Sequence, residues 1–119
     1  MKKYLIPLIL LVLLLTGCVS NSLYYWGNYS NTLYKIKKDP GAESLTKHMD
    51  TIEKIIEKSQ SGKYQVPPGI YCEYGYYLIL KGDIDGGLVY FDKEVTLYPE
   101  SQTFVETMKA QTGKEDTND

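Results

Sequence analysis

The chain contains few side chains that could carry chemistry, and its single histidine stands among charged residues. In 119 residues there are one histidine, two cysteines and no arginine. His48 has Asp50 and Glu53 close by, but one histidine without a group of cysteines makes a poor zinc site. A serine–histidine–aspartate set cannot be defended with one histidine on a charged helix face either. We therefore expect His48 on a helix surface, no metal site, no cofactor and no enzymatic activity.

Acidic residues give one pattern that resembles a metal-binding loop, and it fails in detail. Asp83, Asp85 and Glu94 stand at the first, third and twelfth positions of a calcium loop. However, Gly87 replaces the next ligand, and Leu88 occupies the position where the loop needs a glycine. Nothing marks any two of the 15 acidic residues as a pair for glycoside hydrolysis. The acidic residues therefore predict no site.

Cys18 is the residue whose surroundings do indicate a defined reaction. Lys2 and Lys3 precede an almost wholly apolar run over 4–15. This run is shorter than the roughly 20 residues that span a bilayer, and it has the length of the apolar region of a secretory signal. A buried core helix is the alternative, but no part of the run offers a polar face. We expect residues 1–17 to be a signal peptide.

The residues at the end of that run resemble the lipobox of bacterial lipoproteins: Leu15, Thr16, Gly17 and then Cys18. The resemblance implies cleavage before Cys18, a thioether-linked diacylglycerol on its sulfur, and an acyl chain such as palmitate on its new amine. One acyl chain binds a membrane marginally, whereas two or three hold a protein there. Val19 is not the aspartate of an inner-membrane retention signal, so the resemblance implies the periplasmic face of the outer membrane.

Charge and the second cysteine limit the partners further. Removing Lys2 and Lys3 leaves 11 lysines against 15 acidic residues, a formal charge of −4 that argues against nucleic acid. If Cys18 is acylated, Cys72 has no partner within the chain. Cys72 is then either a small buried apolar residue or half of an intermolecular disulfide.

The rest of the chain predicts an all-α fold of about two helical hairpins and a capping helix. Apolar residues recur at helical spacing, and glycine or proline interrupts them near 39–41, 62, 67–68, 82 and 99. We expect a lipidated tether over 18–23, a helical-repeat domain over 24–110 and a disordered tail over 111–119. The expected helices cover 24–38, 43–59, 70–81 and 84–97, with a last helix that Ser101 caps.

The segment 68–99 resembles a tetratricopeptide repeat, which is a helical hairpin of about 34 residues. Small residues at Gly75 and Gly87 would let its two helices approach closely. Glu94 departs from the motif, because a small residue usually occupies that position. Gly86 departs as well, because glycine inside a helix costs stability. The aromatic, apolar and proline positions of the motif match Tyr71, Tyr74, Leu78, Phe91 and Pro99.

The mature chain also resembles a family of small bacterial lipoproteins known as domain of unknown function 4810. The resemblance rests on residues 24–30, on 66–71 and on the stretch from Tyr90 to Ser101. No activity is assigned to the family. Its members tend to be encoded near other lipoproteins, one of which resembles the curli-secretion pore protein, and this implies a role in an envelope assembly.

Aromatic residues supply the last signal, because the chain holds 12 tyrosines, a residue type common at interfaces. Tyr25, Tyr29, Tyr76 and Tyr77 are candidates to line a partner-binding groove, with packing between the hairpins as the alternative. We expect a membrane-anchored, non-enzymatic module that binds an envelope protein. Another lipoprotein is one candidate for this partner. The alternatives are a structural spacer or stability factor without a groove, and an activator of a peptidoglycan hydrolase.

Overall fold

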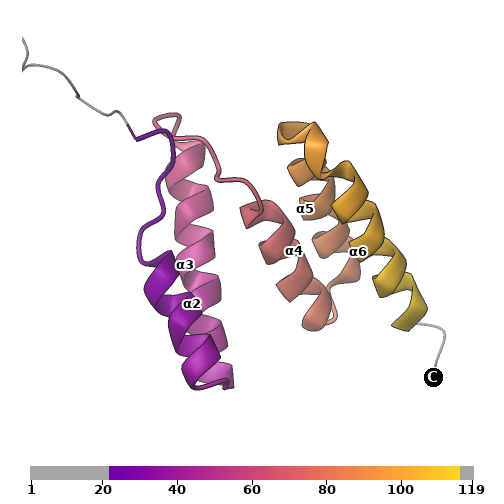
Figure 1. Ribbon diagram of the computed structural model, residues 1–119, viewed down its shortest axis with the longest axis horizontal. Helices are drawn as coiled ribbons and strands as arrows, with labels where there is room; N and C mark the ends of the chain where they lie inside the picture. The colour runs from indigo at the N-terminus through magenta and orange to yellow at the C-terminus, as the bar shows by residue number, and fades with distance from the viewer. Residues whose placement is uncertain (1–21, 116–119) are drawn as a thin grey trace, which may run out of the picture.

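The computed structural model describes residues 22–115, which fold into two helical hairpins and a further helix (Figure 1). The all-α prediction is confirmed. The predicted signal peptide, Cys18 and the last four residues lie outside the described residues. The first hairpin consists of α2 (Tyr29–Lys38) and α3 (Ala42–Gln60). The second consists of α4 (Ile70–Leu80) and α5 (Ile84–Leu97), and a 3₁₀ turn (Pro99–Ser101) leads into α6 (Gln102–Glu115).

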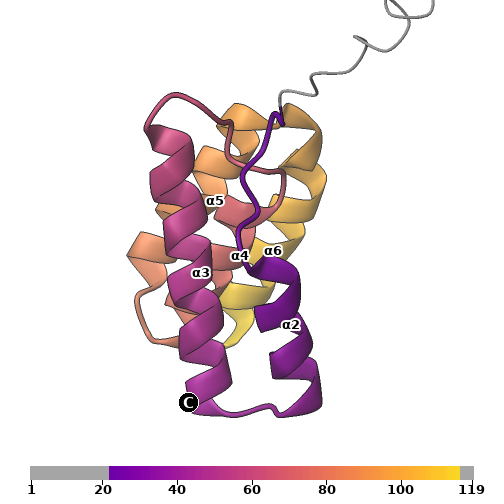
Figure 2. The same ribbon diagram turned by 90° about the vertical axis from the view of Figure 1, so that its left-hand side faces the viewer.

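The predicted start of the first helix at residue 24 is wrong, because α2 begins at Tyr29. Gly27 has a φ of 49°, in the left-handed region that glycine tolerates and that a helix cannot continue through. Residues 22–28 instead run beside the linker that follows α3, and the Leu23 carbonyl accepts a hydrogen bond from the Gln65 amide at 3.0 Å. The entry segment therefore lies against the linker that joins the two hairpins (Figure 2).

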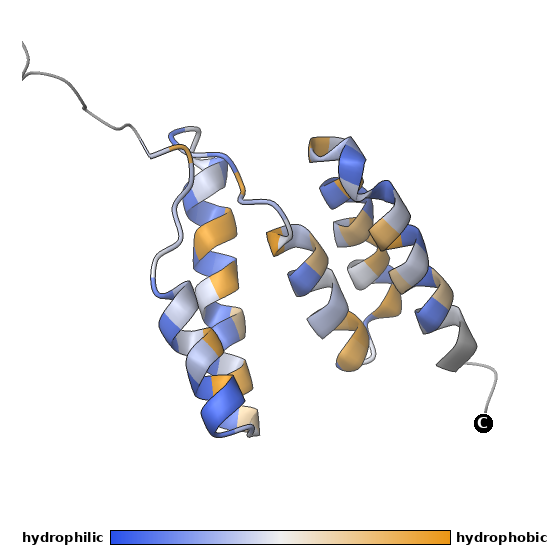
Figure 3. Ribbon diagram, in the orientation of Figure 1, coloured by the Kyte–Doolittle hydropathy of each residue, from blue (hydrophilic) through white to orange (hydrophobic). Residues whose placement is uncertain are grey.

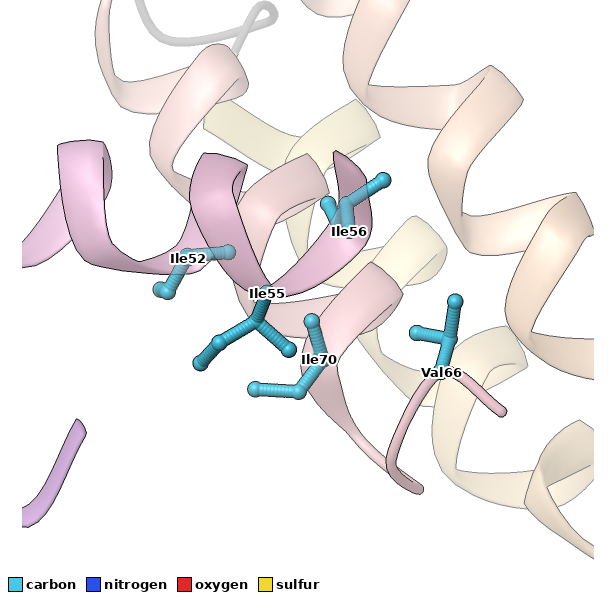
Figure 4. Packing of buried hydrophobic residues seen from close by; sticks show 5 residues of the cluster. All are labelled: Ile52, Ile55, Ile56, Val66 and Ile70. Carbon is cyan, nitrogen blue, oxygen red and sulfur yellow. The ribbon is translucent and has the colours of Figure 1, made fainter. Parts of the chain in front are cut away.

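Leu45, Met49, Ile52 and Ile56 recur at the spacing of one helix face and predict a buried side of α3, which is confirmed for the last three. Met49, Ile52 and Ile56 are buried along one side of the helix, and Ile55 extends this buried side. Charged residues occupy the other side, so that orange and blue alternate along α3 in Figure 3. An amphipathic helix of this kind is stable only with its apolar side covered. Val66 of the linker and Ile70 of the first turn of α4 supply that cover, and Figure 4 shows them together with Ile52, Ile55 and Ile56 of α3.

The two glycines predicted to bring α4 and α5 together do so. A Cβ atom on Gly75 would lie 2.7 Å from the carbonyl oxygen of Gly87, and a Cβ atom on Gly87 would lie 2.6 Å from that of Gly75. These two backbones touch, and Phe91 fills the space beside them with no exposed surface. Phe91 also packs with Cys72 and with Val105 of α6, so a second core joins α4, α5 and α6.

The turn between α4 and α5 explains why a glycine stands at position 86, inside α5. The Asp83 carboxylate accepts a hydrogen bond from the Gly86 amide at 3.0 Å and so caps α5. A Cβ atom on Gly86 would collide with that carboxylate. The capping side chain therefore occupies the space that a larger residue at 86 would need.

The last helix is longer than predicted. Ser101 lies in the 3₁₀ turn that Pro99 begins, and α6 continues from Gln102 to Glu115. The predicted boundary between domain and tail, after residue 110, thus falls inside α6. Within residues 22–115, no helix is both long and apolar enough to cross a membrane.

Candidate functional site

His48 is fully buried where α2, α3 and α4 meet, so the prediction of a surface position is wrong. Its Nδ1 atom lies 2.7 Å from the Thr32 hydroxyl of α2, and its Nε2 atom lies 2.9 Å from Oε1 of Glu73 on α4. The Tyr29 and Tyr77 rings pack against the imidazole, with ring centroids 5.1 and 6.1 Å away. His48 therefore links three helices.

The Glu73 carboxylate is the shared hydrogen-bond acceptor of the residues around His48. Its Oε2 atom accepts from the Tyr29 hydroxyl at 2.7 Å, and its Oε1 atom accepts from His48 and, at 3.4 Å, from the Tyr77 hydroxyl. An ionised carboxylate only accepts hydrogen bonds, so Nε2 of His48 must carry the hydrogen. The Thr32 hydroxyl lies within hydrogen-bond distance of Nδ1, so both ring nitrogens of the buried His48 have partners.

The order threonine, histidine, glutamate resembles a hydrolytic triad, but its geometry favours a structural role. Thr32 is buried in α2, and its hydroxyl also lies 3.0 Å from the Tyr29 carbonyl of the same helix. A nucleophile must reach its substrate, whereas this hydroxyl faces the inside of the fold. Burial, and then the negative charge of Glu73, raise the pKa of Tyr77 to about 12. The group is a polar cross-link between the hairpins.

Glu94, the departure from the repeat motif, caps α4 from the neighbouring helix. It is only 1% exposed, its Oε1 atom accepts from the Gly69 amide at 2.7 Å, and its Oε2 atom accepts from the Cys72 amide at 3.4 Å. The first amides of a helix have no partner within the helix and carry partial positive charge. A carboxylate there satisfies these amides, and this explains why α4 needs no side-chain cap of its own.

A groove of about 380 Å³ opens beside these two carboxylates, between the entry to α2, the first half of α4 and the start of α6. Trp26, Tyr76 and Phe104 line it and are 42%, 41% and 59% exposed. Glu73 and Glu94 supply its acidic groups. Its size is in the range of small-ligand and peptide pockets, and large aromatic side chains with accessible faces are typical of interfaces.

The four candidate tyrosines separate into two pairs. Tyr29 and Tyr76 line the groove. Tyr25 packs instead against Tyr64, with ring centroids 5.9 Å apart, and Tyr77 turns toward His48 and Glu73. The structure thus places two of the candidates at the groove and two in the packing between elements.

Sequence reasoning missed most of the remaining groove. Trp26 lies in the segment 24–28, which the sequence predicts as helix but which precedes α2. Phe104 and Met108 belong to the predicted capping helix, and both line the groove at the four-residue spacing of one helix face. His48 shares a similar spacing with Ile52, Ile55 and Ser59, and this pattern could have identified it as buried.

Cys72 is buried between α4, α5 and α6, which favours the packing role over an intermolecular disulfide. Burial, and then the charge of Glu94, raise the pKa of its thiol to about 11. The thiolate is the reactive form, so at pH 8 the folded protein should contain roughly a hundredth of the thiolate of an ordinary cysteine. We expect Cys72 to react with a thiol reagent at least tenfold more slowly in the folded protein than in urea. Equal rates would contradict its burial.

Comparison with known proteins identifies the family and no more. Residues 23–108 match the family model described as domain of unknown function (DUF4810), and the chain belongs to this family. No curated protein matches it, and neither does any solved structure.

Proposed function

We propose that the protein is a lipid-anchored, non-enzymatic interaction module that presents its groove to another protein of the cell envelope. The single observation that supports this function is the gathering of Trp26, Tyr76 and Phe104, all substantially exposed, around one hollow. Exposed aromatic side chains that surround a concavity cost solvation free energy unless a partner covers them. Under this proposal the hairpins are tetratricopeptide-like, and α4 contributes the first helix of its hairpin to the binding face.

The rigid surroundings of the groove support binding rather than spacing. Glu73 holds Tyr29, and Glu94 holds the first turn of α4, and both segments line the groove. A preorganised surface loses less conformational entropy on binding than a flexible one. A spacer would use these bonds for its own stability, but it would not need exposed aromatic side chains around a groove, and for this reason we prefer the interaction module.

Membrane attachment through Cys18 is the other half of the proposal. It rests on the sequence pattern at 15–18, with a diacylglycerol on the sulfur and an acyl chain on the new amine. Several acyl chains give lasting attachment. The proposed location is the periplasmic face of a bacterial outer membrane, and the proposed partner is an envelope protein, with other lipoproteins among the candidates.

Chemical crosslinking in intact cells tests the proposal. We expect a specific envelope protein to be recovered with the wild-type protein after detergent extraction. Recovery should fall at least fivefold for the double variant Tyr76→Ala and Phe104→Ala, because truncating central aromatic side chains costs the most binding energy. The matched control is Leu80→Ala, since Leu80 is 56% exposed on the same α4 but lies outside the groove.

Two outcomes would reject the groove as the binding site. In one, the groove variant and the control recover the same amount of partner. In the other, no envelope protein is enriched over a non-crosslinked sample. If the recovered material is peptidoglycan or a hydrolase bound to it, the alternative function as a hydrolase activator gains support.

A further inference from the structure

We propose that the groove recognises a peptide segment that carries a lysine or arginine beside an apolar residue. This inference rests on the proposed function and specifies the chemistry of the partner. It combines two properties of the groove lining: aromatic faces, and carboxylates without any basic neighbour in the lining.

The charge of the groove lining is entirely acidic. Glu73 and Glu94 both border the groove, and no lysine of the described residues does. The ion pairs of residues 22–115 that involve lysine, Lys47 with Glu43 and Lys109 with Asp92, lie elsewhere. A cationic side chain that enters the groove therefore meets attraction without competition from a basic residue of the lining.

Glu94 retains capacity for a further donor. A carboxylate has about four lone-pair positions, and Glu94 uses two of them on the amides of Gly69 and Cys72, the second at a long 3.4 Å. The side chain is 1% exposed and has no cationic side chain beside it among the described residues. The start of α4 offsets only about half of its unit charge, so the remaining negative charge would attract an ammonium or guanidinium group that enters the groove.

The aromatic walls favour the same ligand. A cation within about 6 Å of an aromatic face is attracted by the negative charge of that face, most strongly over tryptophan. The chain already uses this interaction on α5, where Lys93 Nζ lies 4.4 Å from the centroid of the Tyr90 ring. In the groove, Trp26, Tyr76 and Phe104 offer faces to which no cation of the described chain is bound. They also provide apolar area for a neighbouring aliphatic side chain.

Selection from a random displayed peptide library tests this specificity. The target is the full-length protein in detergent, with the variant Tyr76→Ala and Phe104→Ala as the counter-target. We expect wild-type protein to enrich peptides that contain a basic residue flanked by apolar residues, and the variant not to enrich them.

A selected, tryptophan-free peptide then gives a quantitative test that leaves the protein unchanged. Trp26 is the only tryptophan, so its fluorescence reports binding at the groove directly. Replacing the basic residue of the peptide by norleucine should weaken binding about tenfold, because the aliphatic stem remains and the charge is lost. Replacement by glutamate should weaken binding further.

The outcomes separate this inference from the proposed function. A groove-dependent consensus without a basic residue, or a norleucine peptide that binds as well as its lysine parent, overturns the cationic specificity and leaves the groove as a binding site. Peptides that bind the wild type and the groove variant equally overturn both. A basic consensus that disappears in the variant supports both.

Discussion

Replacing Gly75 by alanine should lower the free energy of unfolding by about 2 kcal/mol. The new Cβ would lie 2.7 Å from the Gly87 carbonyl oxygen and 2.9 Å from the Phe91 ring. The carbonyl belongs to a helix backbone and cannot move alone, so α4 and α5 must separate. This loss exceeds the gain of up to about 1 kcal/mol that alanine brings to a helix interior. Urea denaturation followed by circular dichroism measures the difference.

Gly113→Ala in α6 is the matched control for this prediction. A Cβ atom at Gly113 meets nothing within 4 Å, so only the helix preference changes, and stability should stay the same or rise by up to about 1 kcal/mol. Effects of the same sign and size at the two positions would mean that the helices do not touch through Gly75.

Replacing Glu73 by alanine should have a larger effect, a loss of about 3 kcal/mol. The change removes the acceptor shared by His48, Tyr29 and Tyr77. The imidazole N–H of His48 is fully buried, and a buried donor left without a partner costs most of its hydration free energy. The same denaturation experiment measures this loss, and Trp26 fluorescence reports whether the groove wall that Tyr29 forms changes with it.

Glu53→Ala separates this effect from the loss of an ordinary tyrosine hydrogen bond. Glu53 accepts from the Tyr74 hydroxyl at 2.7 Å, but on the exposed side of α3, so its removal should cost at most about 1 kcal/mol. If the two variants are equally stable, the buried group around His48 does not hold the hairpins together.

The sequence predicts the helices, their ends and their buried sides from local patterns of residues. The spacing of Met49, Ile52 and Ile56 identifies the buried side of α3, and the boundaries of α5 follow from a turn at one end and Pro99 at the other. Gly75 and Gly87 predict the close approach of two helices because only small residues allow it. Each of these signals depends on residues near one another in the chain.

The buried polar contacts could not be predicted in the same way. The spacing of His48 indicates a buried side, but its partners Glu73 and Thr32 are 25 and 16 positions away. From the sequence alone, Glu94 only departs from the repeat motif, because its role depends on the first amides of α4, which the fold brings beside it. Polar residues are buried only together with their partners, and a single helix pattern does not identify those partners.

The groove required the assembled fold for a related reason. Trp26, Tyr76 and Phe104 come from three segments far apart in the chain, and only the packing of α4 against α3 and α5, and of α6 against α5, brings them to one hollow. The tyrosine count indicated an interface, but it could not distinguish Tyr76, at the groove, from Tyr77, beside His48.

Photo-crosslinking in living cells tests most directly whether the groove contacts a partner. A benzophenone amino acid placed at position 104 should form a covalent product with one envelope protein, whereas the same group at position 80 should not. Phe104 and Leu80 are 59% and 56% exposed, so the two positions differ mainly in whether they line the groove. A product from position 80 as abundant as that from position 104, or none from position 104, would contradict the account.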